Sequence, residues 1–142
     1  MALAIDIADA VTAELAGGAF SQTITPVRRV LPEYELADLK DLRVTVVPSS
    51  VEIEGASRVL SQHDVRIDIG IQKKLGKDLD AEVPVLCGLV DEIAAFLKRR
   101  PLAAAPHAAW VRSANEPIYA PEHLAEQRVF TSVLTVTYRA MS

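Results

Sequence analysis

The sequence has little cysteine, no long apolar run and no excess of positive charge, and each lack excludes a class of protein. Its single cysteine, Cys87, cannot form an internal disulfide, so nothing in the chain requires an oxidising compartment. The longest nearly unbroken apolar run, from Val83 to Val90, is far shorter than the roughly 20 residues of a membrane-spanning helix. The formal net charge of -4 argues against a protein that binds duplex nucleic acid, which needs a basic face.

The size and composition are those of one globular domain. The chain has 142 residues, of which 50% are hydrophobic and 24% are charged, so we expect a single domain over residues 1–142. The alanine-rich N-terminus does not have the pattern of a signal peptide, because it lacks a basic region and acidic residues interrupt its apolar stretch. We therefore expect a soluble protein without a membrane segment that is made in a cytoplasm.

Strict alternation over residues 62–74 predicts a long strand with one buried and one solvent-facing side. A second alternating segment, residues 51–60, precedes it after a very short connection, which predicts an antiparallel hairpin. In both segments the apolar residues have odd numbers, so the charged even-numbered residues share the outer face. These are Glu52, Glu54, Arg58, Asp64, Arg66 and Asp68.

Apolar residues at helical spacing predict helices over residues 3–16 and 81–99. The second helix has an apolar seam that includes Leu86 and Ile93, and we expect this seam to pack on the odd-numbered face of the hairpin. Further strands are predicted over residues 42–47, 110–112 and 128–139, with an edge strand broken by Pro26 and single helical turns within residues 32–41 and 120–127. This order predicts an α+β fold, with a mainly antiparallel β-sheet, one long helix packed on one face and a short N-terminal helix.

The residues that could carry catalysis are not arranged for it. His63, His107 and His123 lack metal-ligand spacing, and neither a Cys-x-x-Cys pair nor a Gly-rich phosphate loop is present. Cys87 lies within the predicted 81–99 helix among apolar neighbours, which is typical of a buried, unreactive thiol. The outer-face carboxylates alternate with arginines, which favours salt bridges over an acid of raised pKa. We therefore predict no catalytic, cofactor-binding or metal-binding residue, and no cofactor.

Seven charged residues are instead the candidates for a contact with another subunit or partner. Four lie on the predicted outer face and three form a basic cluster that follows the long strand: Glu52, Glu54, Arg58, Arg66, Lys73, Lys74 and Lys77.

A set of short motifs over roughly residues 40–140 matches one family in order and spacing. The motifs are the V-V-P strand end, Arg58 before the turn, D-x-x-I-x-I-G-I-Q-K-K, a helix that ends in basic residues, and the closing R-V-F-T-S-V-L-T-V-T-Y. With these features the chain resembles the tail terminator (tail completion) proteins of long-tailed bacteriophages and prophages.

The resemblance implies a small α+β protein that forms a ring, usually of six copies, at the head-proximal end of a phage tail. Such a ring caps the tail tube, stops its growth and presents a surface for joining the head. The implied partners are further copies of the chain, the major tail tube protein and the head-connector or neck protein, with DNA only as passing cargo. The implied protein is not an enzyme, binds no membrane and is found in the host cytoplasm during assembly and then in the virion.

Two other classes of function remain open. One is a different phage neck or tail component, such as a head-closure protein or a tube subunit, and a tube subunit would assemble into open-ended tubes rather than stop at one ring. The other is a small cytosolic enzyme whose site forms at a subunit interface from scattered residues such as His63 and His123. Thermal stabilisation by a metal or a substrate would reveal such an enzyme.

Overall fold

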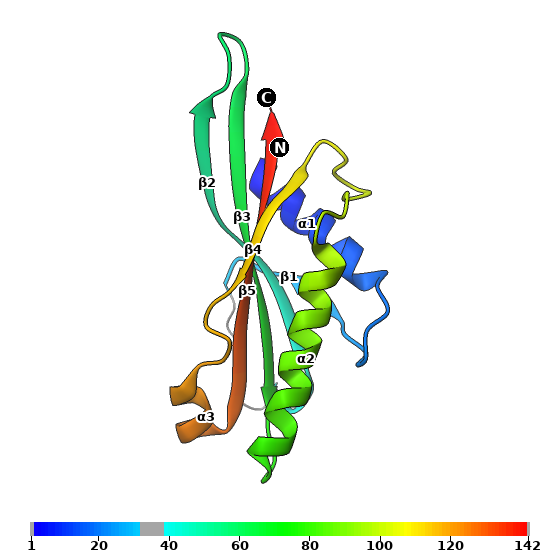
Figure 1. The fold of residues 1–142 in the computed structure, drawn as a ribbon, viewed down its shortest axis with the longest axis vertical. Helices are drawn as coiled ribbons and strands as arrows, with labels where there is room; N and C mark the ends of the chain where they lie inside the picture. Colours follow the sequence, from blue (N-terminus) through cyan, green and yellow to red (C-terminus); the bar gives the residue numbers. More distant parts are fainter. Residues whose placement is uncertain (1, 32–38, 142) are drawn as a thin grey trace.

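The structure, a computed structural model, describes residues 2–31 and 39–141 and has one five-stranded sheet with three helices (Figure 1). In chain order the elements are α1 (Leu3–Ala16), β1 (Pro26–Arg28), β2 (Arg43–Gly55), β3 (Ser61–Lys74), α2 (Leu79–Leu97), β4 (Ala109–Asn115), α3 (Pro121–Gln127) and β5 (Val129–Met141). The strand order is β1-β2-β3-β5-β4, and all neighbours are antiparallel except β1 and β2, which are parallel. The predicted α+β class and mainly antiparallel sheet are confirmed.

The helices differ in part from the prediction. α2 has 19 residues and α1 has 14, so the predicted contrast between one long and one short helix is not shown, and the predicted turn at 120–127 is the seven-residue α3. Asp78 caps α2, because its carboxylate accepts a hydrogen bond of 3.1 Å from the Ala81 N–H. The turn predicted within residues 32–41 lies mostly outside the described residues.

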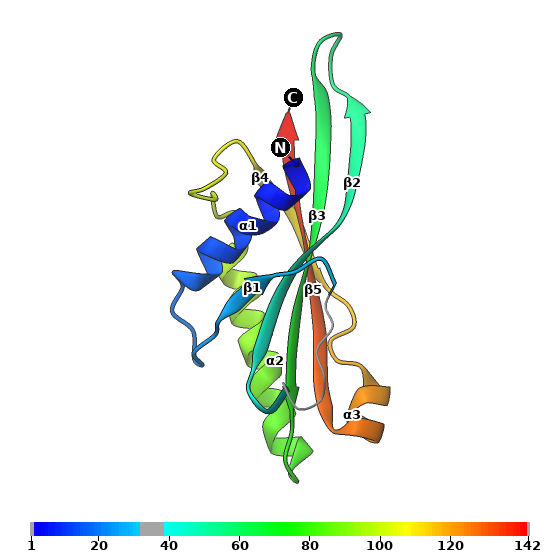
Figure 2. The same ribbon diagram turned by 180° about the vertical axis from the view of Figure 1, so that it is seen from behind.

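The core lies between one face of the sheet and the helices α1 and α2, which lie to the same side of it (Figures 1 and 2). The odd-numbered residues of β3 from Val65 to Ile71 are fully buried, as predicted, and so are Leu134, Val136 and Tyr138 opposite them on β5. The apolar seam of α2 is also buried, including Leu86 and Ile93.

The partner of α2 in the core is different from the predicted one. α2 packs mainly on β5, whereas α1 packs on β2 and β3. We expected α2 to cover the hairpin, but β5 lies between β3 and β4 and α1 occupies the β2 side of the same face. One face of the sheet is therefore covered by two helices, α1 over β2 and β3 and α2 over β5.

The predicted strands 42–47 and 51–60 are one continuous strand, β2, with a register shift between Pro48 and Ser50. The shift changes which residues face the helices. Val44 lies opposite Ile71 before it, and Val51 lies opposite Val65 after it, so the inward parity changes from even to odd. β2 ends at Gly55, so Arg58 lies in the turn of the hairpin and not on a strand face.

The end of the β2–β3 hairpin, residues 51–64, extends beyond both helices, and we call it the hairpin arm (Figures 1 and 2). Val51 is 38% exposed and Ile53 62% exposed, although both lie on the inward side of β2. Their predicted burial is wrong, because alternation specifies which side of the strand a residue faces but not whether a helix covers that side. The hairpin arm thus has a charged outer face and an uncovered apolar inner face.

A partly buried carboxylate joins α1 to the segment that follows α2. Glu14 accepts hydrogen bonds from the Ala103 N–H at 2.7 Å and from Arg100 Nε at 2.8 Å. These two donors hold the pKa of Glu14 below its usual value, the backbone N–H being the stronger cause. The Arg100 guanidinium also lies 4.0 Å from the centre of the Phe96 ring, so the basic segment after α2 is fixed against the body.

Candidate functional site

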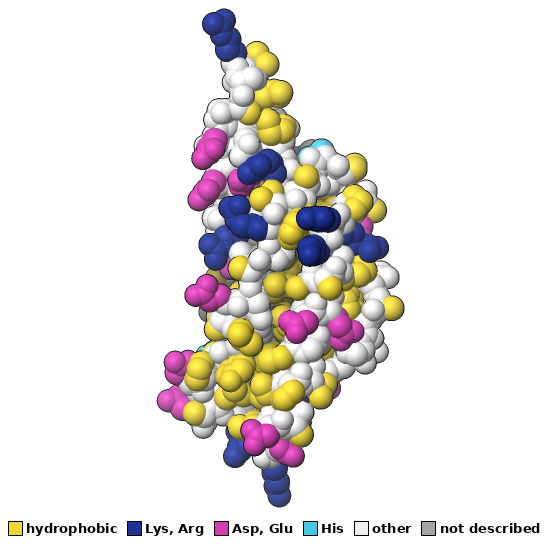
Figure 3. Space-filling model, in the orientation of Figure 1, with side chains coloured by type: hydrophobic (Ala, Val, Ile, Leu, Met, Phe, Trp, Pro, Cys, Tyr) yellow, Lys and Arg dark blue, Asp and Glu magenta, His cyan; other side chains and the backbone are white. Residues whose placement is uncertain are grey.

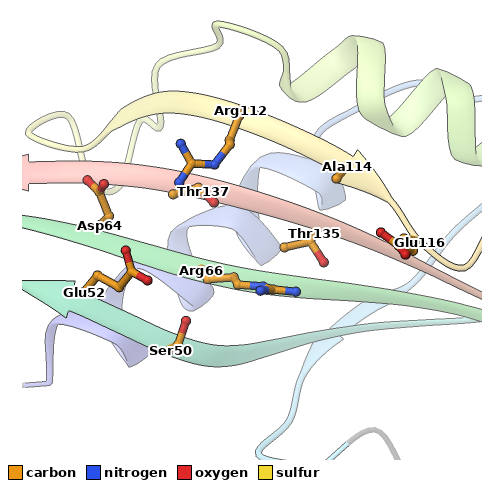
Figure 4. Close-up of a pocket in the computed structure, with 9 residues that line it drawn as sticks. All are labelled: Ser50, Glu52, Asp64, Arg66, Arg112, Ala114, Glu116, Thr135 and Thr137. Carbon is orange, nitrogen blue, oxygen red and sulfur yellow. The ribbon is translucent and has the colours of Figure 1, made fainter.

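The outer face of the sheet, opposite α1 and α2, has a polar groove of about 360 Å³ (Figure 4). It crosses four strands, and its lining residues are Ser50 and Glu52 from β2, Asp64 and Arg66 from β3, Thr135 and Thr137 from β5, Arg112 and Ala114 from β4, and Glu116 just after β4. Side chains of both signs therefore lie within one open depression.

The sheet register explains why these residues meet. Thr137 lies opposite Arg66 on one side and opposite Arg112 on the other, and Arg66 lies opposite Ser50. One cross-strand row thus runs from β2 to β4 through all four strands, with two arginines separated by a threonine. Side chains in such a row are within reach of one another, about 5 Å apart between neighbours.

The next row toward the hairpin arm contains the best-formed ion pair of the groove. Arg139 donates from Nε to Asp64 Oδ1 at 2.8 Å and from Nη2 to Asp64 Oδ2 at 3.1 Å. These hydrogen bonds are the main reason why the pKa of Asp64 is lowered, and the nearby charge of Arg112 contributes less. Asp64 is therefore a fixed carboxylate, because a lowered pKa makes it a poor proton donor near neutral pH.

The seven predicted contact residues are not brought together in one place. They are Glu52 and Arg66 in the groove, Glu54 and Arg58 on the hairpin arm, and Lys73, Lys74 and Lys77 at the opposite end of β3 and in the loop that follows it (Figure 1). On the face that Figure 3 shows, acidic and basic side chains are interspersed rather than separated. The predicted mixture of signs on the outer face is thus present, but the basic cluster belongs to another surface.

Sequence reasoning missed three charged residues of this face, Arg112, Glu116 and Arg139. The sequence pattern could have identified Arg139, because this residue continues the odd-numbered outer face of the final strand beyond Thr137. Arg112 and Glu116 were not, since the register shift between Trp110 and Arg112 hides the alternation of β4. Only the pairing of β4 with β5 brings them into the groove.

The histidines do not meet in the structure. His63 lies on the inward side of β3, opposite Ala140, whereas Asp64 projects outward. His123 is on α3, with Nδ1 2.8 Å from Thr131 Oγ1. Within residues 2–31 and 39–141, no three histidine, cysteine or acidic side chains are grouped so as to hold a metal ion, and no helix has the length and apolar character of a membrane span.

Cys87 is expected to react slowly with thiol reagents in the folded protein. It is partly buried on α2, and burial, with a smaller effect of Asp91, raises the pKa of its thiol and so lowers the thiolate fraction. The measurement is labelling of the native protein with and without denaturant, and denaturant should remove the protection. A matched control is a Cys87→Ser, Ser57→Cys variant, whose thiol lies in the exposed turn of the hairpin. Native labelling of Cys87 at the rate of this control would contradict the expectation.

The arrangement as a whole is an open polar surface with charges of both signs. Its strongest pair, Asp64 and Arg139, is already formed within the chain, while Glu52 and Arg112 make no ion pair with any residue that the structure describes. Such open charges are available to a second molecule.

No protein-family model matches the chain, and no curated protein sequence is similar to it.

Proposed function

We propose that this protein is a structural component of a phage virion, a ring of identical subunits at the head-proximal end of a long tail. The ring stops growth of the tail tube and provides the surface to which the head is joined. The observation that carries the proposal is the resemblance of roughly residues 40–140 to tail terminator proteins, which rests on several short motifs in the same order. The protein acts by binding and not by catalysis, and it needs no cofactor.

The positions of the resembling motifs support this proposal. Apart from Arg58 in the hairpin turn and the basic residues just after α2, they fall on β2, β3, α2 and β5. These elements are neighbours in the fold, because the three strands are adjacent in the sheet and α2 packs on β5. A pattern spread over three adjacent strands and a helix that packs on them describes a scaffold. A family of enzymes would instead share a few polar residues at one site.

The partners of the proposed ring follow from its place in the tail. Each subunit contacts two further copies, and the two ends of the ring contact the major tail tube protein and the head-connector protein. DNA passes through the ring as cargo, and the net charge of -4 suits a channel that does not retain a polyanion. Assembly takes place in the host cytoplasm and involves no membrane.

The experiment is deletion of the gene from the phage or prophage, followed by electron microscopy of the particles. We expect tails of abnormal length, or finished tails that do not join heads, and restoration of both by the wild-type gene in trans. Tails absent altogether would indicate a tube subunit, and filled heads that lose DNA beside normal tails would indicate a head-closure protein. Normal, infectious and correctly joined particles would contradict all three.

A further inference from the structure

The sheet has two edges at which the backbone is unpaired within the described part of the chain. β1 pairs with β2 only from Val44 to Val46, and Arg29 donates one more bond to the Val46 carbonyl, so residues 47–55 have a free edge. At the other side of the sheet β4 pairs only with β5. An open strand edge is a template for pairing with another chain.

The two edges carry complementary charge on the same outer face. Glu52 and Glu54 project from the β2 edge, and Arg112 projects from the β4 edge (Figure 4 shows Glu52 and Arg112). All three are exposed and lie beyond ion-pair distance of any described residue, although the charge of Arg112 acts on Asp64 and that of Glu54 acts on Arg139. The cross-strand row from Ser50 to Arg112 already joins these edges at one level of the sheet.

The inner faces of the two edges match as well. A second row runs from Val51 through Val65 and Tyr138 to Trp110. Beside Trp110 there is a mostly apolar hollow of about 360 Å³, whose other lining residues are Ala94 and Ala95 of α2, Lys98 at its end, and Arg112 and Ser113 of β4. Of the exposed inner side chains of the hairpin arm, Val51 lies in the row of Trp110, and Ile53 lies one inward row nearer the tip of the arm.

The strand directions allow these edges to meet in copies of the same orientation. β2, β3, β5 and β4 are successively antiparallel, so β4 runs opposite to β2. A second copy placed beside the first without inversion therefore presents β4 antiparallel to β2. If the second copy is not shifted along the strand direction, its Arg112 lies opposite Ser50 of the first copy. If it is shifted by two residues, its Arg112 lies opposite Glu52. In both arrangements Arg112 is within cross-strand reach of Glu52.

Pairing of two β2 edges with each other is disfavoured by the same charges. It would place Glu52 and Glu54 of both copies on one face of the joined sheet, and like charges across a strand pair are destabilising. The contact between unlike edges has no such cost. Because it joins different surfaces of the subunit, it repeats from copy to copy and closes into a ring when the rotation between copies permits.

We propose that the β2 edge of one copy pairs with the β4 edge of a second copy, with Glu52 beside Arg112 and with Val51 and Ile53 in the hollow next to Trp110. The inference deepens the proposed function and rests on it for closure of the assembly into a ring. The edge contact itself can be measured on the purified protein without any phage.

The first test is disulfide trapping of a Ser50→Cys, Ala114→Cys variant in a Cys87→Ser background, which keeps Glu52 and Arg112. Residues 50 and 114 are opposite one another in the charge-pairing register between copies. Within one chain they are separated by three strand spacings, about 14 Å, which is too far for a disulfide. Oxidation should therefore give a series of linked oligomers that ends at one closed species, and a Ser50→Cys, Glu126→Cys control should give none.

Two outcomes of this trapping would overturn the proposal. One is efficient dimerisation of the Ser50→Cys single variant, which would show that like edges meet. The other is the lack of intermolecular bonds in the double variant at every protein concentration. A mixture of the two single-cysteine variants should give only the mixed dimer.

The second test is charge exchange, followed by sedimentation equilibrium. Glu52→Arg and Arg112→Glu should each weaken self-association by about tenfold or more, and the double variant should recover most of the loss. Glu126→Arg, the same change of charge on exposed α3, should have no effect. Equal weakening in the double variant would overturn the contact. If the edge contact is confirmed but deletion of the gene leaves normal particles, only the proposed tail function is refuted. If deletion gives abnormal tails but the charge exchanges leave self-association unchanged, only the edge contact is refuted.

Discussion

Replacing Ile93 with alanine should lower the free energy of unfolding by about 2–5 kcal/mol. Ile93 is fully buried in the seam of α2, where it belongs to the core shared by both helices and the sheet. The truncation removes apolar contacts and leaves a cavity that the neighbouring secondary structure cannot fill by collapse. Leu86→Ala, about two helical turns earlier on the same seam and 2% exposed, should behave alike.

Urea denaturation monitored by circular dichroism is the measurement, and α2 provides its own control. Val85 is next to Leu86 in sequence but is 57% exposed, so Val85→Ala should change stability by no more than about 0.5 kcal/mol. Because alanine is the best helix former, helix propensity alone would stabilise both variants, so a loss of stability in Leu86→Ala reports burial. Losses below about half a kcal/mol at both Leu86 and Ile93 would show that this seam is not part of the core.

Local periodicity predicted the elements of this fold well. The seam of α2 and the inward face of β3 both follow from the spacing of apolar residues, and each is buried as expected. These features are encoded within a dozen neighbouring residues. A short-range pattern is sufficient because one side of each element is buried along most of its length.

What the sequence did not reveal depends on the pairing of distant segments. β5 lies between β3 and β4, which no local pattern indicates, and this insertion moves α2 from the hairpin to β5. The register shifts after Pro48 and Trp110 reverse the alternation of inward and outward residues within a strand. The sequence pattern therefore predicts two strands where the structure has β2, and only a part of β4. The groove combines both effects, since it needs the strand order and the corrected register together.

Gly70→Ala should destabilise the protein by about 1–3 kcal/mol, although alanine usually suits a strand better than glycine. A Cβ at position 70 would lie 2.8 Å from Thr45 Oγ1, closer than real Cβ contacts. Thr45 is the direct cross-strand partner of Gly70, is 1% exposed and, as a β-branched residue, has little rotamer freedom to give way. No described glycine has a positive φ, so the requirement at this position is space and not backbone conformation.

A double-mutant cycle with Thr45→Ala tests this cause directly. In the Thr45→Ala background the oxygen that Cβ would meet is gone, so Gly70→Ala should become neutral or stabilising, by up to about 1 kcal/mol, since alanine restricts the unfolded chain more than glycine does. Gly55→Ala is the matched control, because β2 at Gly55 has no atom within 4 Å of the added Cβ. Equal effects at positions 55 and 70, or the same loss at position 70 in both backgrounds, would show that Thr45 is not what requires the glycine.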